Sequence, residues 1–407
     1  MTYQEAESWL YKLESYYREG KVAYHPGLVG IERLCQAIGN PHKKIKTVHV
    51  AGTNGKGSSS HMLASVLQES GYKTGLYTSP HLKSFRERMR VNGQPISGEG
   101  VATFVEKYKA LIEETQPSFF EVTVAMAFEC FANEQVDIAI IEVGLGGRLD
   151  ATNIIIPEIS LITNIGLDHT NLLGDTLGVI AAEKAGIIKP GVPVVIGETH
   201  PETEAVFKRI AIERQAPITF ADQQGNEKAY SLDLKGNYQQ LNLKGVLQVI
   251  GKLRQLGWTL SEPDVEKGLS SVISNTGLKG RWQQLSDNPV TICDTGHNRE
   301  GIELVIEQLK ALTYDRLYLI LGFVDDKDVD EILKLIPEGA ELTFCGFSQP
   351  RALTPDALKA KAEQAGFDAE SAADVNRAFE MVRKKAGEND LIFVGGSTFV
   401  VAELNEL

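Results

Sequence analysis

The feature that most constrains this chain is a glycine-rich segment between an apolar strand pattern and an amphipathic helix pattern. The segment Gly52-Thr53-Asn54-Gly55-Lys56-Gly57-Ser58 follows the apolar run TVHVA and precedes SSHMLASVL. In this order, small residues let backbone N–H groups close around phosphate oxygens, and the helix N-terminus adds partial positive charge. Lys56 is placed to reach the terminal phosphates of a nucleotide. These seven residues are therefore the candidate nucleotide-binding loop.

The segment departs from the usual phosphate-loop pattern, G-x-x-x-x-G-K-[ST], at two positions. Val50 stands where the first glycine belongs, and Gly57 follows the lysine where serine or threonine is usual. Ser58 comes one position later, so the usual hydroxyl contact with magnesium is in question here. The alternative interpretation is a glycine turn that only caps a helix, but the flanking strand and helix favour a phosphate loop.

Strand and helix patterns alternate along the rest of the chain, which predicts a doubly wound α/β fold. The run VDIAIIEVG is continuously apolar, as expected of a strand buried in a parallel sheet. The first 40 or so residues have a helical apolar stripe (Trp9, Leu10, Leu13), and the segment 218–245 is read as a hairpin followed by a helix. Further strands are expected at TGLYTS, ISLITNIG and VPVVIG, with a helix at LGVIAAEKAGII.

A second α/β pattern begins near RWQQLSDNPV, where Pro289 and the polar residues before it suggest a hinge. We therefore predict an ATP-binding domain over residues 1–284 and a smaller Rossmann-like domain over residues 285–407. Four apolar strands are expected in the second domain, at VTICD, LYLILGF, ELTFCGF and LIFVGGS.

Composition limits the partners. The net charge of -13 predicts repulsion of polyanions, so we expect no nucleic-acid partner and a locally built phosphate site. Four scattered cysteines are typical of a reduced, cytoplasmic protein. The N-terminus lacks a signal-peptide pattern, and no apolar run reaches the roughly 20 residues that span a membrane. We expect a monomer.

Several longer motifs resemble one known family. They are VAGTNGKGS, TSPHLKSFRERMRVNG, IIEVGLGGRLDATN, DHTNLLGDT and EKAGIIKPG. In this order they resemble folylpolyglutamate synthase and dihydrofolate synthase, relatives of the Mur ligases, and the likeness extends from about residue 30 to the C-terminus. The resemblance implies a Mur-ligase-like first domain and a glutamate-ligase second domain.

The resemblance also implies a reaction. ATP phosphorylates a carboxylate of a folate or pteroate (dihydropteroate or a reduced folate), and the amine of L-glutamate attacks the acyl phosphate. An amide, ADP and phosphate result. The chemistry requires phosphorylation because a carboxylate is a poor electrophile, and it requires cations because two anions must meet.

Four residues have implied roles at two magnesium ions. Similarity to the family makes Ser79, Glu142 and His169 metal ligands, with Ser79 replacing the phosphate-loop hydroxyl. The family's counterpart of Lys184 is carbamylated, which turns a cation into an anion; burial that lowers the pKa of this lysine would assist the reaction with CO₂. Each residue also has a purely structural alternative. Ser79 could belong to a Ser-Pro turn, and Glu142 could be a charged strand end. His169 could be structural, and Lys184 could form a salt bridge.

Other residues are assigned to the nucleotide and to the glutamate. Similarity to the family's G-x-H-Q-x-x-N and D-x-A-H-N motifs makes Asn242, Arg281 and Asp294 nucleotide-binding residues, although Tyr238 and Gly296 depart from those motifs. His297 is expected to position glutamate or the acyl phosphate. Catalytic roles are assigned to Lys184, His297 and Asp294.

Two segments resemble the dihydropteroate pocket of bifunctional members. They are Ser118-Phe119-Phe120-Glu121 and Leu149-Asp150-Ala151. The aromatic rings would stack on a pterin, but core packing explains the two phenylalanines equally well. Arg86, Arg88 and Arg90 could offset an acidic glutamyl tail, but we favour the interpretation that they form a solvated face.

Four alternative functions differ in substrate or class. Tail extension of folates alone would make the chain monofunctional, although GGRLDATN and SFFE favour two activities. A Mur-type ligase for nucleotide-linked muramyl peptides usually has a further N-terminal domain. A regulatory or motor NTPase leaves the Lys184 and DTGHN segments unexplained. An oxidoreductase requires G-x-G-x-x-G, but Leu149 occupies the last glycine position of GLGGRLD.

Overall fold

The computed structural model describes residues 1–18, 27–225 and 228–407. Contacts between Cα atoms divide them into two compact units. The first comprises Met1–Asp233 and Gln240–Gly277, and the second comprises Leu234–Gln239 and Leu278–Leu407. The division falls ahead of the predicted boundary at residue 284, which lies inside strand β9 (Gln283–Asp287), the antiparallel partner of β10 (Val290–Cys293).

An 8-stranded sheet organises the first unit, in the order β4-β3-β2-β5-β1-β6-β7-β8. Neighbours from β2 to β8 pair in parallel, whereas β3 and β4 form an antiparallel edge. Strands β1, β5, β6 and β7 are buried along their whole length, as their continuous apolar sequences predict. The strands are β1 Thr47–Ala51, β2 Thr74–Tyr77, β3 Met89–Val91, β4 Gln94–Pro95, β5 Ile138–Glu142, β6 Ile159–Ile162, β7 Val194–Ile196 and β8 Ile218–Phe220.

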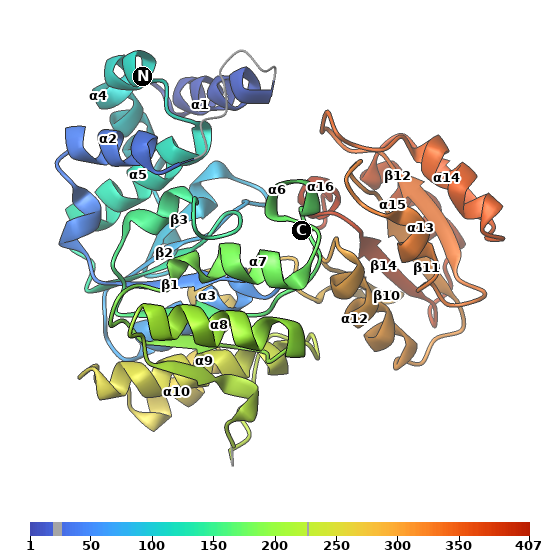
Figure 1. Cartoon of the computed structure of the whole chain (residues 1–407). Helices are drawn as coiled ribbons and strands as arrows, with labels where there is room; N and C mark the ends of the chain where they lie inside the picture. The colour runs from blue at the N-terminus through green and yellow to red at the C-terminus, as the bar shows by residue number, and fades with distance from the viewer. Residues whose placement is uncertain (19–26, 226–227) are drawn as a thin grey trace. The chain divides into compact units, whose positions relative to one another are not determined.

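Helices cover this sheet in two groups. Helices α1, α2, α4 and α5 lie together at one end of the unit, α8 to α10 lie at the opposite end, and α7 lies between the two groups, beside α8 (Figure 1). The first group encloses the larger apolar core, whereas α7 and α8 pack over β6 and β7. The helices are α1 Tyr3–Arg18, α2 Val29–Ala37, α3 Lys56–Glu69, α4 Gly98–Thr115, α5 Phe119–Asn133, α6 Thr170–Leu173, α7 Leu177–Lys184, α8 Pro201–Glu213, α9 Gln239–Gln255, α10 Glu262–Leu269 and α11 Val272–Thr276.

The second unit is built on a 6-stranded sheet in the order β13-β12-β11-β14-β10-β9. The four expected apolar strands are β10, β11, β12 and β14. Two strands were missed, β9 and β13, because both are short of apolar residues and lie at the sheet edges. The remaining elements are β11 Leu317–Leu321, β12 Glu341–Cys345, β13 Ala369–Ala372, β14 Leu391–Gly395, α12 Arg299–Lys310, α13 Val329–Leu333, α14 Pro355–Gln364, α15 Val375–Lys385 and α16 Thr398–Glu403.

Two sequence interpretations are wrong. The segment 218–245 contains no hairpin among its described residues, because β8 pairs in parallel with β7 and α9 starts at Gln239. Arg88 and Arg90 are not solvated, since their exposed fractions are 8% and 6%. Arg90 donates to the carbonyl of Thr276 at the end of α11, a contact that sequence cannot reveal.

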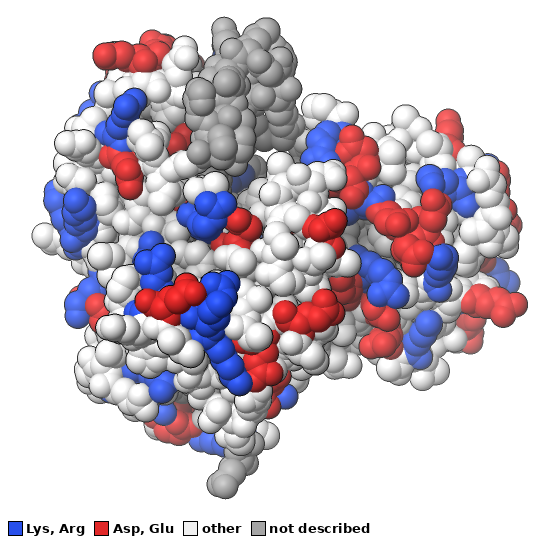
Figure 2. Space-filling view, viewed as in Figure 1, with Lys and Arg blue, Asp and Glu red and all other residues white. Residues whose placement is uncertain are grey.

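The described residues also bear on surface properties. None of the helices among them is long and apolar enough to cross a membrane. All four cysteines are free thiols. Basic and acidic side chains are interspersed on the face shown in Figure 2, and no continuous basic patch is visible on the described part of that face.

Candidate active site

The phosphate loop connects the end of β1 to the start of α3. Gly52 has a φ of +146° and Gly55 a φ of +83°, both unfavourable for other residues. A Cβ atom on Gly52 would collide with Thr163 Oγ1, and one on Gly55 would collide with Asn242 Oδ1. Close approach therefore requires glycine at both positions, and it places the predicted nucleotide residue Asn242 directly against the loop.

The loop is tied to the end of β6 by two residues that the sequence analysis missed. Thr163 Oγ1 donates to the carbonyl oxygen of Asn54 at 2.6 Å. Asn164 accepts from Asn54 N through its side-chain oxygen at 2.8 Å and from Thr53 N through its carbonyl oxygen at 3.0 Å. Their position at the end of a strand beside β1 was the available signal, because parallel strands bring their carboxyl ends to one edge.

Two lysine ammonium groups converge on the same loop. Lys56 Nζ donates to the carbonyl oxygens of Gly52 and Thr53 at 3.0 and 3.1 Å. Lys184, at the end of α7, donates from Nζ to the Gly52 carbonyl at 2.9 Å and is only 4% exposed. Ser58 is buried in the first turn of α3. The sequence thus folds both predicted lysines onto the glycine that opens the loop.

The pKa of Lys184 is lowered to about 7. Burial is the largest cause, and the positive charge of Lys56 acts in the same direction, whereas Asp168 and Asp150 oppose the shift. Near neutral pH a substantial fraction of Lys184 is therefore an uncharged amine. That is the form able to react with CO₂, so this property fits the carbamylation that the family resemblance implies.

The structure brings together two of the three predicted metal ligands. Glu142 ends β5 and is 4% exposed, and its Oε2 accepts from Ser79 N at 3.2 Å. Strands β2 and β5 are parallel neighbours, so the residues that follow them share an edge. A carboxylate and a hydroxyl at such an edge fit a hard cation such as Mg²⁺.

His169 has a different environment. Its φ is +49°, its side chain is 38% exposed, and its Nε2 lies 4.0 Å from Asp168 Oδ2. Within the described residues no group of three His, Cys, Asp or Glu side chains could hold a metal. Magnesium commonly uses one or two carboxylates together with substrate phosphates, so Glu142 and Ser79 remain a suitable donor pair.

The GLGGRLDATN segment is held by a buried relay of hydrogen bonds. Asp150 Oδ1 accepts from Thr152 N and Oγ1 at 3.0 and 2.5 Å, and Oδ2 accepts from Leu145 N at 2.9 Å. His49 Nε2 lies 2.9 Å from Thr152 Oγ1. Because the threonine hydroxyl donates its one hydrogen to Asp150, His49 must donate to that hydroxyl.

The charges of this relay follow from burial. Burial, and next the charge of Lys189, lowers the pKa of His49 to about 3, so the imidazole is neutral. Burial raises the pKa of Asp150, while its hydrogen bonds act in the opposite direction. Asp150 thus orders its own loop. Its neighbour Ala151 begins the short 3₁₀ helix, and Leu149 is half-buried. A substrate contact for these three residues stays a prediction.

The SFFE segment has a clear local role at the start of α5. Ser118 and Glu121 form a capping box, with Glu121 N donating to Ser118 Oγ at 3.1 Å and Ser118 N donating to Glu121 Oε2 at 2.7 Å. Phe119 is buried, and its ring lies 6.0 Å from that of Tyr11, with Arg88 above one face. Phe120 is half-buried. Pterin stacking by either ring stays a prediction.

In the second unit, Asp294 is the centre of a compact hydrogen-bond cluster. It is 3% exposed; its Oδ2 accepts from Tyr238 Oη at 2.5 Å and from Trp282 N at 2.7 Å, and Oδ1 accepts from Gly296 N at 2.7 Å. Burial and then the Asp294 charge raise the pKa of Tyr238 well above its ordinary value. Tyr238, which departs from the family motif, thus supports the predicted aspartate.

The other predicted residues of this unit flank that cluster. Arg281 precedes Trp282 and is close enough to influence the Tyr238 phenol electrostatically. His297 Nδ1 lies 3.0 Å from the carbonyl oxygen of Thr295, so Nδ1 carries the proton in that bond. The geometry leaves the roles of Arg281, Asp294 and His297 as predictions.

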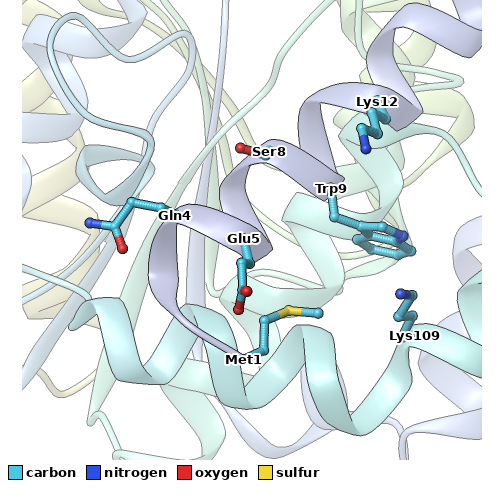
Figure 3. Close-up of a pocket in the computed structure, with 7 residues that line it drawn as sticks. All are labelled: Met1, Gln4, Glu5, Ser8, Trp9, Lys12 and Lys109. Carbon is cyan, nitrogen blue, oxygen red and sulfur yellow. The ribbon is translucent and has the colours of Figure 1, made fainter.

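A surface pocket of about 440 Å³ lies elsewhere, on α1 and α4 (Figure 3). Trp9 and Lys109 face each other across it. None of its lining residues was predicted to be functional. The lining residues are Met1, Gln4, Glu5, Ser8, Trp9, Lys12 and Lys109.

Comparison with known proteins gives consistent matches along the chain. The Mur ligase middle domain matches residues 50–255, and the glutamate ligase domain of Mur ligases matches residues 280–398. The dihydrofolate synthase/folylpolyglutamate synthase of Bacillus subtilis is 33% identical, over 99% of this chain and 98% of the relative.

Solved structures agree. The structure of E. coli FolC in complex with DHPP and ADP superposes with a TM-score of 0.85 at 30% identity, covering 98% of this chain and 96% of that one. A bifunctional folylpolyglutamate synthase/dihydrofolate synthase with Mn, AMPPNP and L-glutamate bound has a TM-score of 0.84 at 29% identity and covers 98% of this chain and 96% of that one.

A Mur ligase middle domain followed by a glutamate ligase domain defines an ATP-dependent ligase that joins a carboxylate to an amino acid. Within that superfamily, the chain belongs to the dihydrofolate synthase/folylpolyglutamate synthase family. The predicted family, α/β fold class and ligase chemistry are thereby confirmed. The alternatives without ligase activity, the NTPase and the oxidoreductase, are wrong.

Proposed function

We propose that the chain is bifunctional and adds L-glutamate both to dihydropteroate and to reduced folates. Bifunctional relatives from Bacillus subtilis and E. coli match nearly their whole length. The relatives support the two substrates, and the chemistry common to both activities is supported by the convergence of Lys56 and Lys184 on the phosphate loop, at the edge where Glu142 and Ser79 also meet. The positive charge of Lys56 and the hard oxygen donors Glu142 and Ser79 are what a phosphoryl transfer to a carboxylate requires.

The protein's own residues have the following proposed parts. Backbone N–H groups of the loop and Lys56 bind the ATP phosphates, and Asn242 contacts the nucleotide from α9. Ser79, Glu142 and His169 hold divalent cations, which supply charge neutralisation when bound. Arg281 and Asp294 bind the nucleotide, and His297 positions the glutamate. SFFE and Leu149-Asp150-Ala151 contact the pteroate.

The decisive experiment measures glutamate-dependent ADP release with ATP and Mg²⁺, in parallel on dihydropteroate and on a reduced folate monoglutamate. We expect activity on both. Activity on the folate alone would favour the monofunctional alternative; a relative from Lacticaseibacillus casei, 34% identical over 81% of this chain, carries the name folylpolyglutamate synthase. Inactivity on both would refute the proposal and return the Mur-type substrates to consideration.

We also propose that Lys184 is carbamylated in the active enzyme. Its neutral amine attacks CO₂, a C–N bond forms, and one proton is released to solvent. The lowered pKa and the burial of Lys184 support this step. We expect a ¹³C carbamate signal in the protein equilibrated with ¹³C-bicarbonate, absent from Lys184→Met. A fully active enzyme without that signal would exclude the modification.

The compartment and assembly are proposals as well. Free cysteines support a cytoplasmic location. The acidic net charge of -13 supports a monomer. Sedimentation of the purified chain would test the monomer directly.

A further inference from the structure

Glu198 is a carboxylate near the phosphate loop that neither the sequence motifs nor the proposed reaction uses. It follows β7 at the carboxyl edge of the sheet and is half-buried. Asn164 Nδ2 donates to Glu198 Oε1 at 3.4 Å, while Asn164 Oδ1 accepts from Asn54 N at 2.8 Å. A single amide side chain therefore separates the Glu198 carboxylate from the phosphate loop.

The Glu198 carboxylate has few donors for its burial. The long bond from Asn164 is its only hydrogen bond from the described residues, and none of their Lys, Arg or His side chains pairs with it within 4.0 Å. Burial is the largest cause that raises the pKa of Glu198; the charge of Asp222 adds to it, and Asn164 and Lys244 oppose it. Neither Glu198 oxygen is among the buried atoms that lack a hydrogen-bond partner, so the carboxylate is accessible from outside and can accept from a ligand donor.

The surroundings of Glu198 point toward the nucleotide. Helix α9 approaches Gly197 so closely that a Cβ on Gly245 would lie 3.7 Å from its Cα. One turn earlier, the same helix carries Asn242, which packs on Gly55. Asn164 and Asn242 thus both contact the tip of the phosphate loop, and Glu198 lies next to the first of them. Ligands of parallel α/β sheets bind along this edge.

We propose that the Glu198 carboxylate accepts a hydrogen bond from the nucleoside part of ATP. This inference rests on the ATP dependence of the ligase reaction. A carboxylate repels the triphosphate, so it cannot contact that part of the ligand directly. The uncharged donors of ATP are the exocyclic amino group of adenine and the ribose hydroxyls, and one of these donates to Glu198. Glu198 is therefore a specificity residue for the nucleotide.

The test combines a change in the protein with a change in the nucleotide, as in a double-mutant cycle, and measures KM for the nucleotide. Glu198→Gln keeps an oxygen for Asn164 but turns an N–H group toward the ligand, and we expect KM for ATP to rise roughly 10- to 100-fold. With the wild-type enzyme, removing the correct donor from ATP should give a similar rise. The analogues are purine riboside triphosphate, which lacks the amino group of the base, and 2′-deoxy-ATP and 3′-deoxy-ATP, which each lack one ribose hydroxyl. Together they show whether the base or the ribose donates to Glu198.

Coupling between the two changes decides the outcome. For the analogue that lacks the bonded donor, Glu198→Gln should raise KM no further, because the interaction is already absent. KM for the folate and kcat should stay within about two-fold of wild type, because the lost hydrogen bond binds ATP equally in the ground state and in the transition state. Independent, multiplicative effects for all three analogues would overturn the proposal. A changed Mg²⁺ dependence would also overturn it, by making Glu198 a metal ligand.

Asp222→Asn provides a matched control. Asp222 is a neighbouring carboxylate, but its oxygens already accept from Thr199 N and Oγ1 at 2.8 and 2.6 Å. We expect no change in nucleotide selectivity. Wild-type ligation with ATP establishes the proposed function independently, so failure of the Glu198 proposal is distinguishable. ADP binding by calorimetry and the thermal melting of each variant separate recognition from misfolding.

Discussion

At the scale of single residues, burial determines the chemistry of the candidate site. Lys184 and His49 are ordinary bases in water, but both lose their charge readily inside the first unit. For His49 the neutral form donates to Thr152 and so orders Asp150. For Lys184 the neutral form makes the amine reactive. Burial thus orders a loop in the case of His49 and makes an amine reactive in the case of Lys184.

The depressed pKa of Lys184 predicts a pH-dependent stability. The pKa of Lys184 is about 7 in the folded protein and 10.5 for an ordinary lysine, so between these values the unfolded chain binds more protons. Folding stability attributable to this residue therefore rises as pH rises from about 7 toward 10.5, by at most about 1.4 kcal/mol per pH unit. Below pH 7 both states are protonated and this contribution is constant.

Denaturant unfolding of wild type and Lys184→Met in CO₂-free buffer measures this effect. The difference between the two should change across pH 7 to 10, in favour of wild type at the higher pH. A constant difference would contradict the shifted pKa. Lys359→Met is the control, because Lys359 lies on α14 in the second unit and is not among the charges that shift the pKa of Lys184.

Gly52 carries a prediction about backbone geometry. Gly52→Ala places a Cβ against Thr163 Oγ1 at a φ of +146°, so the loop must move. We expect a loss of about 1–3 kcal/mol in stability and weakened ADP binding, measured by melting and calorimetry. Gly251→Ala in α9, where a Cβ meets nothing within 4 Å, is the control and should be neutral or stabilising. Unaltered ADP binding by Gly52→Ala would contradict the close approach.

At the scale of elements, each candidate residue is positioned by the end of a strand or helix. Glu142, Thr163 and Glu198 lie at or just after the ends of β5, β6 and β7, and Lys184 ends α7. The loop after β5 is joined to α7 as well, because Arg148 N donates to the carbonyl oxygen of Glu183 at 2.8 Å. The GLGGRLDATN segment therefore connects the predicted metal carboxylate to the reactive lysine.

This connection predicts the effect of a change at Thr152. Thr152→Val removes the hydroxyl between His49 and Asp150 at nearly constant volume, leaving buried polar atoms unpaired. We expect about 1–3 kcal/mol of destabilisation and reduced ligation, whereas Thr152→Ser should retain both. The measurement is chemical unfolding together with ADP release. Equal behaviour of the valine and serine variants would show that the hydroxyl contributes nothing.

The sequence predicted elements better than the contacts between them. Apolar runs such as VDIAIIEVG identify central strands because both faces are buried, whereas AESA at β13 carries no such pattern. Arg88 was misread because a guanidinium can be buried against His81, a partner seven residues earlier in a folded loop. Thr163, Asn164 and Glu198 were overlooked for the same reason: their roles depend on which strands become neighbours.

At the scale of the whole molecule, the two units have separate apolar cores. The first has clusters under α1, α2, α4 and α5 and around α7 and α8, and the second has its own cluster around β11 and β14. The phosphate loop and both lysines belong to the first unit, whereas Asp294 and His297 belong to the second. Separate cores allow the units to unfold in separate transitions, so a ligand can stabilise one more than the other.

This arrangement predicts a selective effect of ADP with Mg²⁺ on unfolding. Trp9 and Trp258 lie in the first unit and Trp282, which is buried, lies in the second. In a chain carrying Trp9→Phe and Trp258→Phe, fluorescence therefore reports the second unit alone, while calorimetry reports both. At about 100 times the dissociation constant, ligand adds about 2.7 kcal/mol to the species that binds it. We expect the calorimetric transition of the first unit to shift upward more than the Trp282 transition, and Lys56→Ala to abolish that shift. Identical shifts in both signals would mean that the two units unfold as one cooperative body.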